Sequence, residues 1–150
     1  MSGGYTTPAV MAALVTKCGQ VALDGEVRDG AEPGDDSARE VIAVGFTNPD
    51  DDNAAEAQAS PGGLGPRDKE EYDIHCAVAV ARGDKGVADT RTRAFGILGA
   101  LRDLLVADQT LNATCMRARV SSWAMTEDAT PGGPVVRLRF DVHVEAFTPK

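Results

Sequence analysis

The sequence has few aromatic residues, few cysteines and no long apolar run. Aromatic residues make up 5% of the 150 residues, which argues against a stacking platform for single-stranded nucleic acid. The three cysteines, Cys18, Cys76 and Cys115, form no CxxC pair and do not indicate a disulfide framework. No apolar run approaches the ~20 residues of a membrane-spanning helix, and no signal peptide is visible. We therefore expect a reduced protein that is made in the cytoplasm and makes no membrane contact.

Basic residues are also scarce relative to acidic ones. The chain has 15 lysines and arginines against 23 acidic residues, which gives a net charge of −8 and a pI of about 4.7. A global basic footprint for nucleic acid is therefore absent, although a local basic patch stays open. Hydrophobic residues make up 43% of the chain, enough for the core of one domain spanning residues 1–150.

Sequence motifs that carry chemistry are missing as well. The chain has no phosphate-binding GxxxxGK[ST] motif and no GxSxG nucleophile motif. Residues 63–65 (Gly-Leu-Gly) begin like a dinucleotide fingerprint, but Asp68 stands where the third glycine belongs. The acidic run Asp50, Asp51 and Asp52 resembles the start of a calcium loop but lacks the glycine at its sixth position.

The two histidines, His75 and His143, have no neighbour at a metal-ligand spacing. A Cys76–His143 dyad would need both side chains on one face of a sheet. Strand alternation instead places Cys76 on the inward face and His143 on the outward face. The sequence therefore predicts no catalytic residue, no cofactor and no metal site.

One strand and one helix organise the predicted fold. Residues 72–81 alternate between apolar and other side chains with a period of two, which is typical of a strand with one buried face. Residues 87–107 place Val87, Ala94, Leu98, Leu101 and Leu105 on one stripe, which predicts a long helix. On the far side of this helix, Asp89 and Arg93 lie one turn apart. We expect the helix to lie across the apolar face of the sheet.

The rest of the chain predicts one shorter helix and four more strands. The helix begins near Thr7 and Pro8 and ends at Gly19. The further strands are expected at residues 20–27, 40–47, 112–126 and 135–147. Residues 48–68 read as a long mobile loop. The expected class is α+β, with a mostly antiparallel or mixed sheet of about five strands, a long helix on one face and a shorter N-terminal helix.

Four arginines are predicted to share the outward face of the last two strands. Alternation places Arg117, Arg119, Arg137 and Arg139 there, together with Trp123. One interpretation is a solvated face on which Asp141 and Glu145 pair with the arginines. A second is a subunit interface, where arginine and tryptophan are enriched. A nucleic-acid patch is the third.

Several stretches of the sequence resemble one family, over residues 5–149. They include Leu23-Asp24-Gly25, Val41-Ile42-Ala43-Val44-Gly45-Phe46, Glu70-Glu71-Tyr72-Asp73-Ile74-His75-Cys76, Gly83-Asp84, Arg91-Thr92-Arg93-Ala94-Phe95-Gly96-Ile97-Leu98, Val136-Arg137-Leu138-Arg139-Phe140 and Ala146-Phe147-Thr148. Together they resemble the tail terminator, or tail completion, proteins of long-tailed actinobacterial phages. Neck and head–tail joining proteins are of similar size and fold.

The resemblance implies a structural virion protein rather than an enzyme. Such proteins form a ring, expected to be hexameric, that caps the tail tube at its head-proximal end and offers a surface for the head connector. The implied partners are further copies of the chain, the major tail tube protein and the connector, while DNA passes through the lumen without specific binding. Asp50, Asp51 and Asp52 are candidates to meet the arginines of an adjacent subunit. Alternatives are a neck or connector protein, or a small intracellular ligand-binding domain or enzyme.

Overall fold

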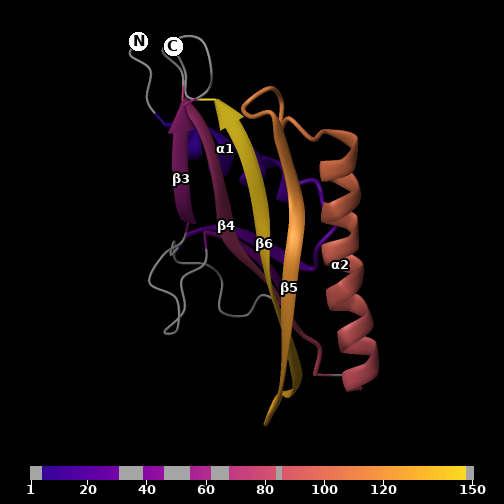
Figure 1. Cartoon of the computed structure of the whole chain (residues 1–150). Helices are drawn as coiled ribbons and strands as arrows, with labels where there is room; N and C mark the ends of the chain where they lie inside the picture. Colours follow the sequence, from indigo (N-terminus) through magenta and orange to yellow (C-terminus); the bar gives the residue numbers. More distant parts are fainter. Residues whose placement is uncertain (1–4, 31–38, 46–54, 62–67, 84–85, 148–150) are drawn as a thin grey trace.

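The computed structural model describes residues 5–30, 39–45, 55–61, 68–83 and 86–147. In chain order the elements are α1 (Thr7–Cys18), β1 (Gly25–Asp29), β2 (Glu40–Val44), β3 (Ala55–Pro61), β4 (Asp68–Ala81), α2 (Val87–Ala107), β5 (Arg117–Thr130) and β6 (Gly133–Phe147). Figure 1 shows the long strands β4, β6 and β5 side by side, with α2 running along them. The α+β class with a mixed sheet and two helices, expected from the sequence, is confirmed.

The sheet has six strands in the order β1-β2-β4-β6-β5, and β3 also pairs with β4. β1 and β2 are parallel, whereas every other pairing is antiparallel. β4 and β6 pair over thirteen positions, from Lys69↔Phe147 to Ala81↔Val135. Because β4 lies at the centre, its alternate side chains form the middle of the core.

Both helices pack against the same face of the sheet, which we call the inner face. Ile74, Cys76 and Val78 of β4 point to this face and are buried, as are Leu138 and Val142 of β6. α1 contributes buried side chains at positions 10, 14 and 18, and α2 contributes them at positions 90, 94, 97, 98, 101 and 105. The core is therefore a single layer between two helices and one sheet face.

Helix α2 has the bounds that its apolar stripe predicted. Its buried residues repeat at three- and four-residue spacings, as a helix covered on one side requires. One position differs, because Val87 is 41% exposed and Thr90 is buried instead. The Thr90 hydroxyl donates a hydrogen bond to the Gly86 carbonyl, which satisfies the hydroxyl inside the core.

Strand boundaries differ from the prediction in several places, of which three change the interpretation. β1 begins at Gly25 rather than at residue 20, and β5 begins at Arg117 rather than at residue 112. Leu111, Asn112 and Ala113 have positive φ, a backbone that a strand cannot contain. Residues 55–61, expected within a loop, form β3, and the remaining loop residues 48–54 and 62–67 lie outside the described residues.

A buried ion pair connects the start of β2 with α2. The Glu40 side chain is fully buried, and its carboxylate accepts hydrogen bonds from Arg93 Nε at 2.7 Å and Nη2 at 2.9 Å. The Asp24 amide donates a third bond to it at 2.7 Å, and Arg93 also donates to the Ala22 carbonyl. Arg93 lowers the pKa of Glu40, against the opposing effect of burial. Arg93 therefore holds β2 and the chain before β1, and is not merely a solvent-facing neighbour of Asp89.

A second buried carboxylate positions the N-terminus of α1. Glu70 of β4 accepts hydrogen bonds from the Thr6 amide and hydroxyl, both at 3.0 Å. The Thr6 hydroxyl also lies 3.0 Å from the Tyr72 hydroxyl. A negative charge at a helix N-terminus is favourable, because the first amides of the helix lack partners within it. This contact fixes where α1 begins against the sheet.

A candidate interaction surface on the open face of the sheet

The face turned away from both helices, which we call the outer face, bears most of the charged side chains of the long strands. Strand register assigns the following residues to it: Glu71, Asp73, His75, Arg117, Arg119, Arg137, Arg139, Asp141, His143 and Glu145. All are exposed or half-buried. In the described part of the chain, no helix packs on this face.

Two histidine–aspartate pairs cross the outer face between β4 and β6. His75 Nδ1 lies 2.6 Å from Asp141 Oδ1, and His143 Nδ1 lies 2.9 Å from Asp73 Oδ1. Each pair joins residues that stand directly opposite one another in the ladder. The histidine is on β4 in one row and on β6 in the other. The pairs fix the orientation of these four side chains in the middle of the outer face.

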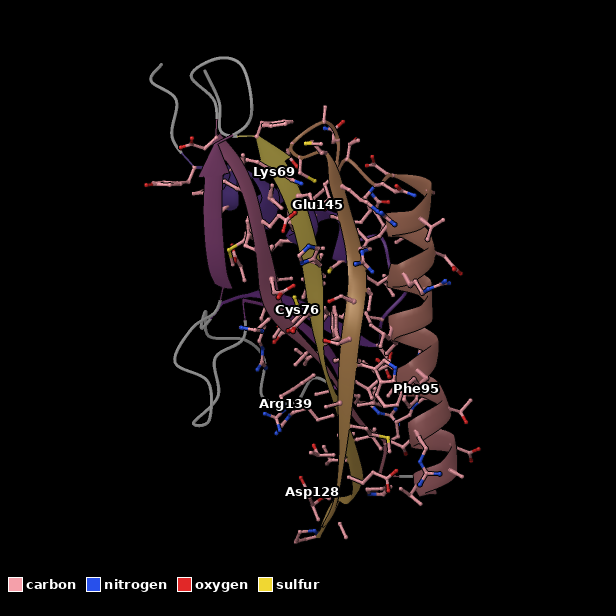
Figure 2. All side chains as sticks on the ribbon, in the orientation of Figure 1. Lys69, Cys76, Phe95, Asp128, Arg139 and Glu145 are labelled. Carbon is pink, nitrogen blue, oxygen red and sulfur yellow. The ribbon has the colours of Figure 1, made fainter. Side chains whose placement is uncertain are left out.

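The four predicted arginines do share the outer face, but they form two separate pairs. Arg117 and Arg119 on β5 stand opposite Glu145 and His143, whereas Arg137 and Arg139 lie further along β6. The rows of residues 143 and 139 are four residues apart, which corresponds to about 13 Å along a strand. Figure 2 shows Arg139 on the side of the sheet away from α2. The outer face therefore has two basic positions separated by the histidine–aspartate pairs.

Trp123 does not belong to this face, which corrects the sequence prediction. The pairing of β5 with β6 shifts by one residue between Val120 and Ser122, so the extra residue Ser121 forms a β-bulge. A bulge moves every later side chain to the opposite face. Trp123 consequently pairs with Phe140, on the α2 side, and its ring contacts Phe95 edge to face at 5.0 Å between centroids.

The three acidic residues predicted to meet the arginines, Asp50, Asp51 and Asp52, lie outside the described residues. Their placement against a neighbouring subunit stays a prediction.

The structure separates the two members of the imagined cysteine–histidine dyad. Cys76 is buried on the inner face, where loss of solvation raises the pKa of its thiol above the usual range. His143 is on the outer face and pairs with Asp73. Burial likewise raises the pKa of Cys18 to about 12. Neither thiol is poised to act as a nucleophile at neutral pH.

Among the residues that the structure describes, no three or more His, Cys, Asp or Glu side chains come together as metal ligands. Within the same residues, no helix combines the length and the apolar character that crossing a membrane would require.

Sequence reasoning missed a groove between the edge strand β5 and helix α2. Two adjoining hollows, of about 210 and 280 Å³, share Arg102 and Val120 as lining residues. Trp123, 56% exposed, lies in the second hollow beside Phe95, which Figure 2 shows between α2 and β5. The signal in the sequence was Trp123 itself, but strict alternation assigned this tryptophan to the wrong face.

The structure has a distant likeness to a solved structure, whereas its sequence matches no known family. No family model matches the chain, and no curated protein matches it. Among solved structures, the chain is similar to a chain from the virion of a native gene transfer agent particle. The two are 17% identical, the match covers 93% of this chain and 85% of the other, and the TM-score is 0.46. At this level of similarity, function has to be argued from the residues of this chain.

Proposed function

We propose that this chain is a structural virion protein that forms a ring at the head-proximal end of a phage tail tube. The ring ends tube polymerisation and offers a surface for head–tail joining. The terminator role rests on the stretches that resemble the tail terminator family, above all residues 70–76, 91–98 and 136–140. Residues 70–76 lie in central strand β4, 91–98 in α2 and 136–140 in β6, so the resemblance follows the elements that build the core.

The observation that supports an assembly role is the open outer face of β4, β6 and β5. Charged side chains of both signs occupy it in rows, and in the described part of the chain neither helix covers it. A ring subunit needs one surface for its neighbours and another for the tube, and such contacts run head to tail. Rows of alternating charge fix the register of a partner more than they add affinity.

Within this face, Arg137 and Arg139 are our candidates for the subunit contact. Neither forms an ion pair with another described residue, whereas Asp141 is already engaged by His75. In the ring we expect these arginines to meet an acidic segment of the next subunit, with Asp50, Asp51 and Asp52 as the candidates. Trp123 is no longer part of this proposed contact, because the bulge places it on the other face.

The ring is proposed to be a hexamer that contacts the major tail tube protein on one side and a connector protein on the other. The protein is made in the host cytoplasm and ends up in the virion, and DNA passes through the ring without specific binding. The net charge of −8 agrees with this, because an acidic protein tends to repel the phosphate backbone.

Deleting the gene tests the terminator role directly. Electron microscopy of lysates should then show tails of uncontrolled length, and a plasmid copy should restore tails of one length. Tails that end normally without the gene would refute the role. A connector protein gives a different result, since tails of normal length would accumulate without attached heads.

Charge reversal tests the proposed contact. Arg137→Glu combined with Arg139→Glu should leave a folded chain, since the side chains lie on an open face, but native mass spectrometry and tail assembly should show no ring. Asp103→Lys on α2 is the control, because that side chain is 80% exposed and lies away from the outer face. Normal rings from the double variant would exclude this part of the face while leaving the terminator role open to the deletion test.

A further inference from the structure

One wall of the groove between β5 and α2 is the free edge of β5, whose main-chain groups could pair with a further strand. β5 pairs with β6 on one side, and within the described residues no strand pairs with its other side. Two contacts between β5 and the α2 side of the groove mark the ends of this free edge. At one end the Ala118 amide donates to the Gln109 carbonyl at 2.7 Å, and at the other Arg91 pairs with Glu127. Between them, β5 runs from Arg119 to Thr126, about 25 Å of strand edge.

An exposed edge of this length is an unusual feature in a soluble protein, because unpaired amides and carbonyls attract other strands. Proteins blunt such edges with charges and bulges, and the bulge at Ser121 and the arginines on β5 have that effect against indiscriminate pairing. The same features also make the edge selective, since they admit only a strand whose charges and side-chain spacing match.

The α2 side of the groove is apolar. Phe95 and Leu98 of α2 face Val120 and Trp123 of β5 across the hollow, and Arg102 stands on α2 at its rim. The Trp123 ring is held edge to face on Phe95 yet remains 56% exposed. A fixed, half-exposed indole beside a hollow is the type of anchor on which an incoming apolar side chain packs.

The outer side of the same edge is basic. Arg117 and Arg119 project to the outer face at the beginning of β5, and neither forms an ion pair with another described residue. A strand added to β5 would place its alternate side chains on the two sides. One set would meet Trp123 and Phe95, and the other would meet Arg117 and Arg119.

We propose that this groove binds an extended acidic segment of a partner protein, in which acidic and apolar residues alternate. The segment adds to β5 as a further strand, with its apolar side chains against Trp123 and Phe95 and its carboxylates beside Arg117 and Arg119. Main-chain hydrogen bonds supply affinity in this mode, and the side-chain sites on alternate residues supply specificity. A helical segment would leave the edge of β5 unpaired. The inference goes beyond the proposed ring, which uses Arg137 and Arg139.

The chain provides its own reporter for the test. Trp123 is the single tryptophan, so its fluorescence reports on the groove alone. The probe is the synthetic peptide acetyl-Glu-Val-Asp-Leu-Glu-Val-Asp-amide, titrated into the full-length protein at low salt. We expect a saturable change in fluorescence that weakens as salt is added, because the paired charges are exposed. A matched peptide with lysine at every acidic position should not bind.

Three variants of the experiment separate the parts of the proposal. Arg117→Glu with Arg119→Glu should weaken binding about tenfold or more through lost attraction and new repulsion, whereas Arg137→Glu with Arg139→Glu should bind normally. Peptides N-methylated on alternate residues should differ, because only one of the two registers points its amides at β5.

Several outcomes would overturn the proposal. They are a fluorescence change that does not saturate, equal binding by the Arg117 and Arg119 double variant, and full binding by both methylated peptides. Sedimentation measurements of the protein without peptide supply the last test. A dimer that the peptide cannot dissociate would show that a second copy of the chain occupies β5 instead.

Discussion

Replacing Arg93 by methionine should destabilise the fold by about 3 kcal/mol at pH 7. Removing one partner of a buried ion pair costs about 3–5 kcal/mol, because the other charge stays buried without compensation. Glu40 would lose the bonds at 2.7 and 2.9 Å from the guanidinium and keep only the one from the Asp24 amide. We expect the lower end of the range, because the Arg93 side chain is 32% exposed and water can replace part of the contact.

The loss should depend on pH, with a sign that the structure fixes. Arg93 lowers the pKa of Glu40 from its ordinary value of 4.5, so the pair contributes stability above that pH and loses it as pH falls through the lowered pKa. In Arg93→Met, burial still raises the pKa of Glu40, and only the Asp24 amide and the charge of Arg82 remain to lower it. The variant is therefore penalised mainly where the carboxylate must stay charged. The difference between wild type and variant should therefore shrink from pH 7 to pH 3.

Urea unfolding followed by circular dichroism, at a series of pH values, measures both quantities. Adding Glu40→Gln to Arg93→Met should recover part of the loss at pH 7, because a neutral amide is less costly to bury than a charge. Arg102→Met is the control, since Arg102 is 67% exposed and its nearest carboxylate is 3.8 Å away. A loss below 1 kcal/mol, or one that is the same at pH 3 and pH 7, would show that the pair does not behave as a buried one.

Two further predictions concern the core and the close approach of β1 to β2. Leu101→Ala should cost about 2–5 kcal/mol in urea unfolding, because this side chain is fully buried in the middle of α2. Val106→Ala, at a 58% exposed position, should cost little. Equal losses would contradict the observed packing. Gly25→Ala should destabilise strongly, since its Cβ would lie 1.7 Å from the Glu40 carbonyl oxygen. Gly96→Ala should instead stabilise by about 0.5–1 kcal/mol, because the backbone is helical and the new Cβ would meet no atom within 4 Å beyond its own turn of helix. A thermal melt that ranks the two alanine variants the other way would refute this reasoning.

The candidate interface could be predicted from the sequence only in part. Alternation placed Arg137 and Arg139 on the face opposite Leu138, and the structure has them there. The same rule failed for Trp123, because the bulge at Ser121 adds one residue to β5 and reverses the faces beyond it. Two neighbouring serines tolerate either face, so the local sequence contains no sign of the slip. The groove beside α2, which depends on that reversal, was therefore invisible.

Taken by itself, the sequence determined the local elements whose pattern repeats several times. The bounds of α2 and the inward faces of β4 and β6 follow from periodicities of 3.6 and 2. These periodicities are visible within short stretches of neighbouring residues. Tertiary structure alone decided what joins distant parts of the chain. Arg93 reaches Glu40, 53 residues away, and β3 forms where composition indicated a loop, since its pairing with β4 comes from main-chain groups that every sequence has. Such contacts depend on which elements meet in space, and periodicity along the chain contains no record of that.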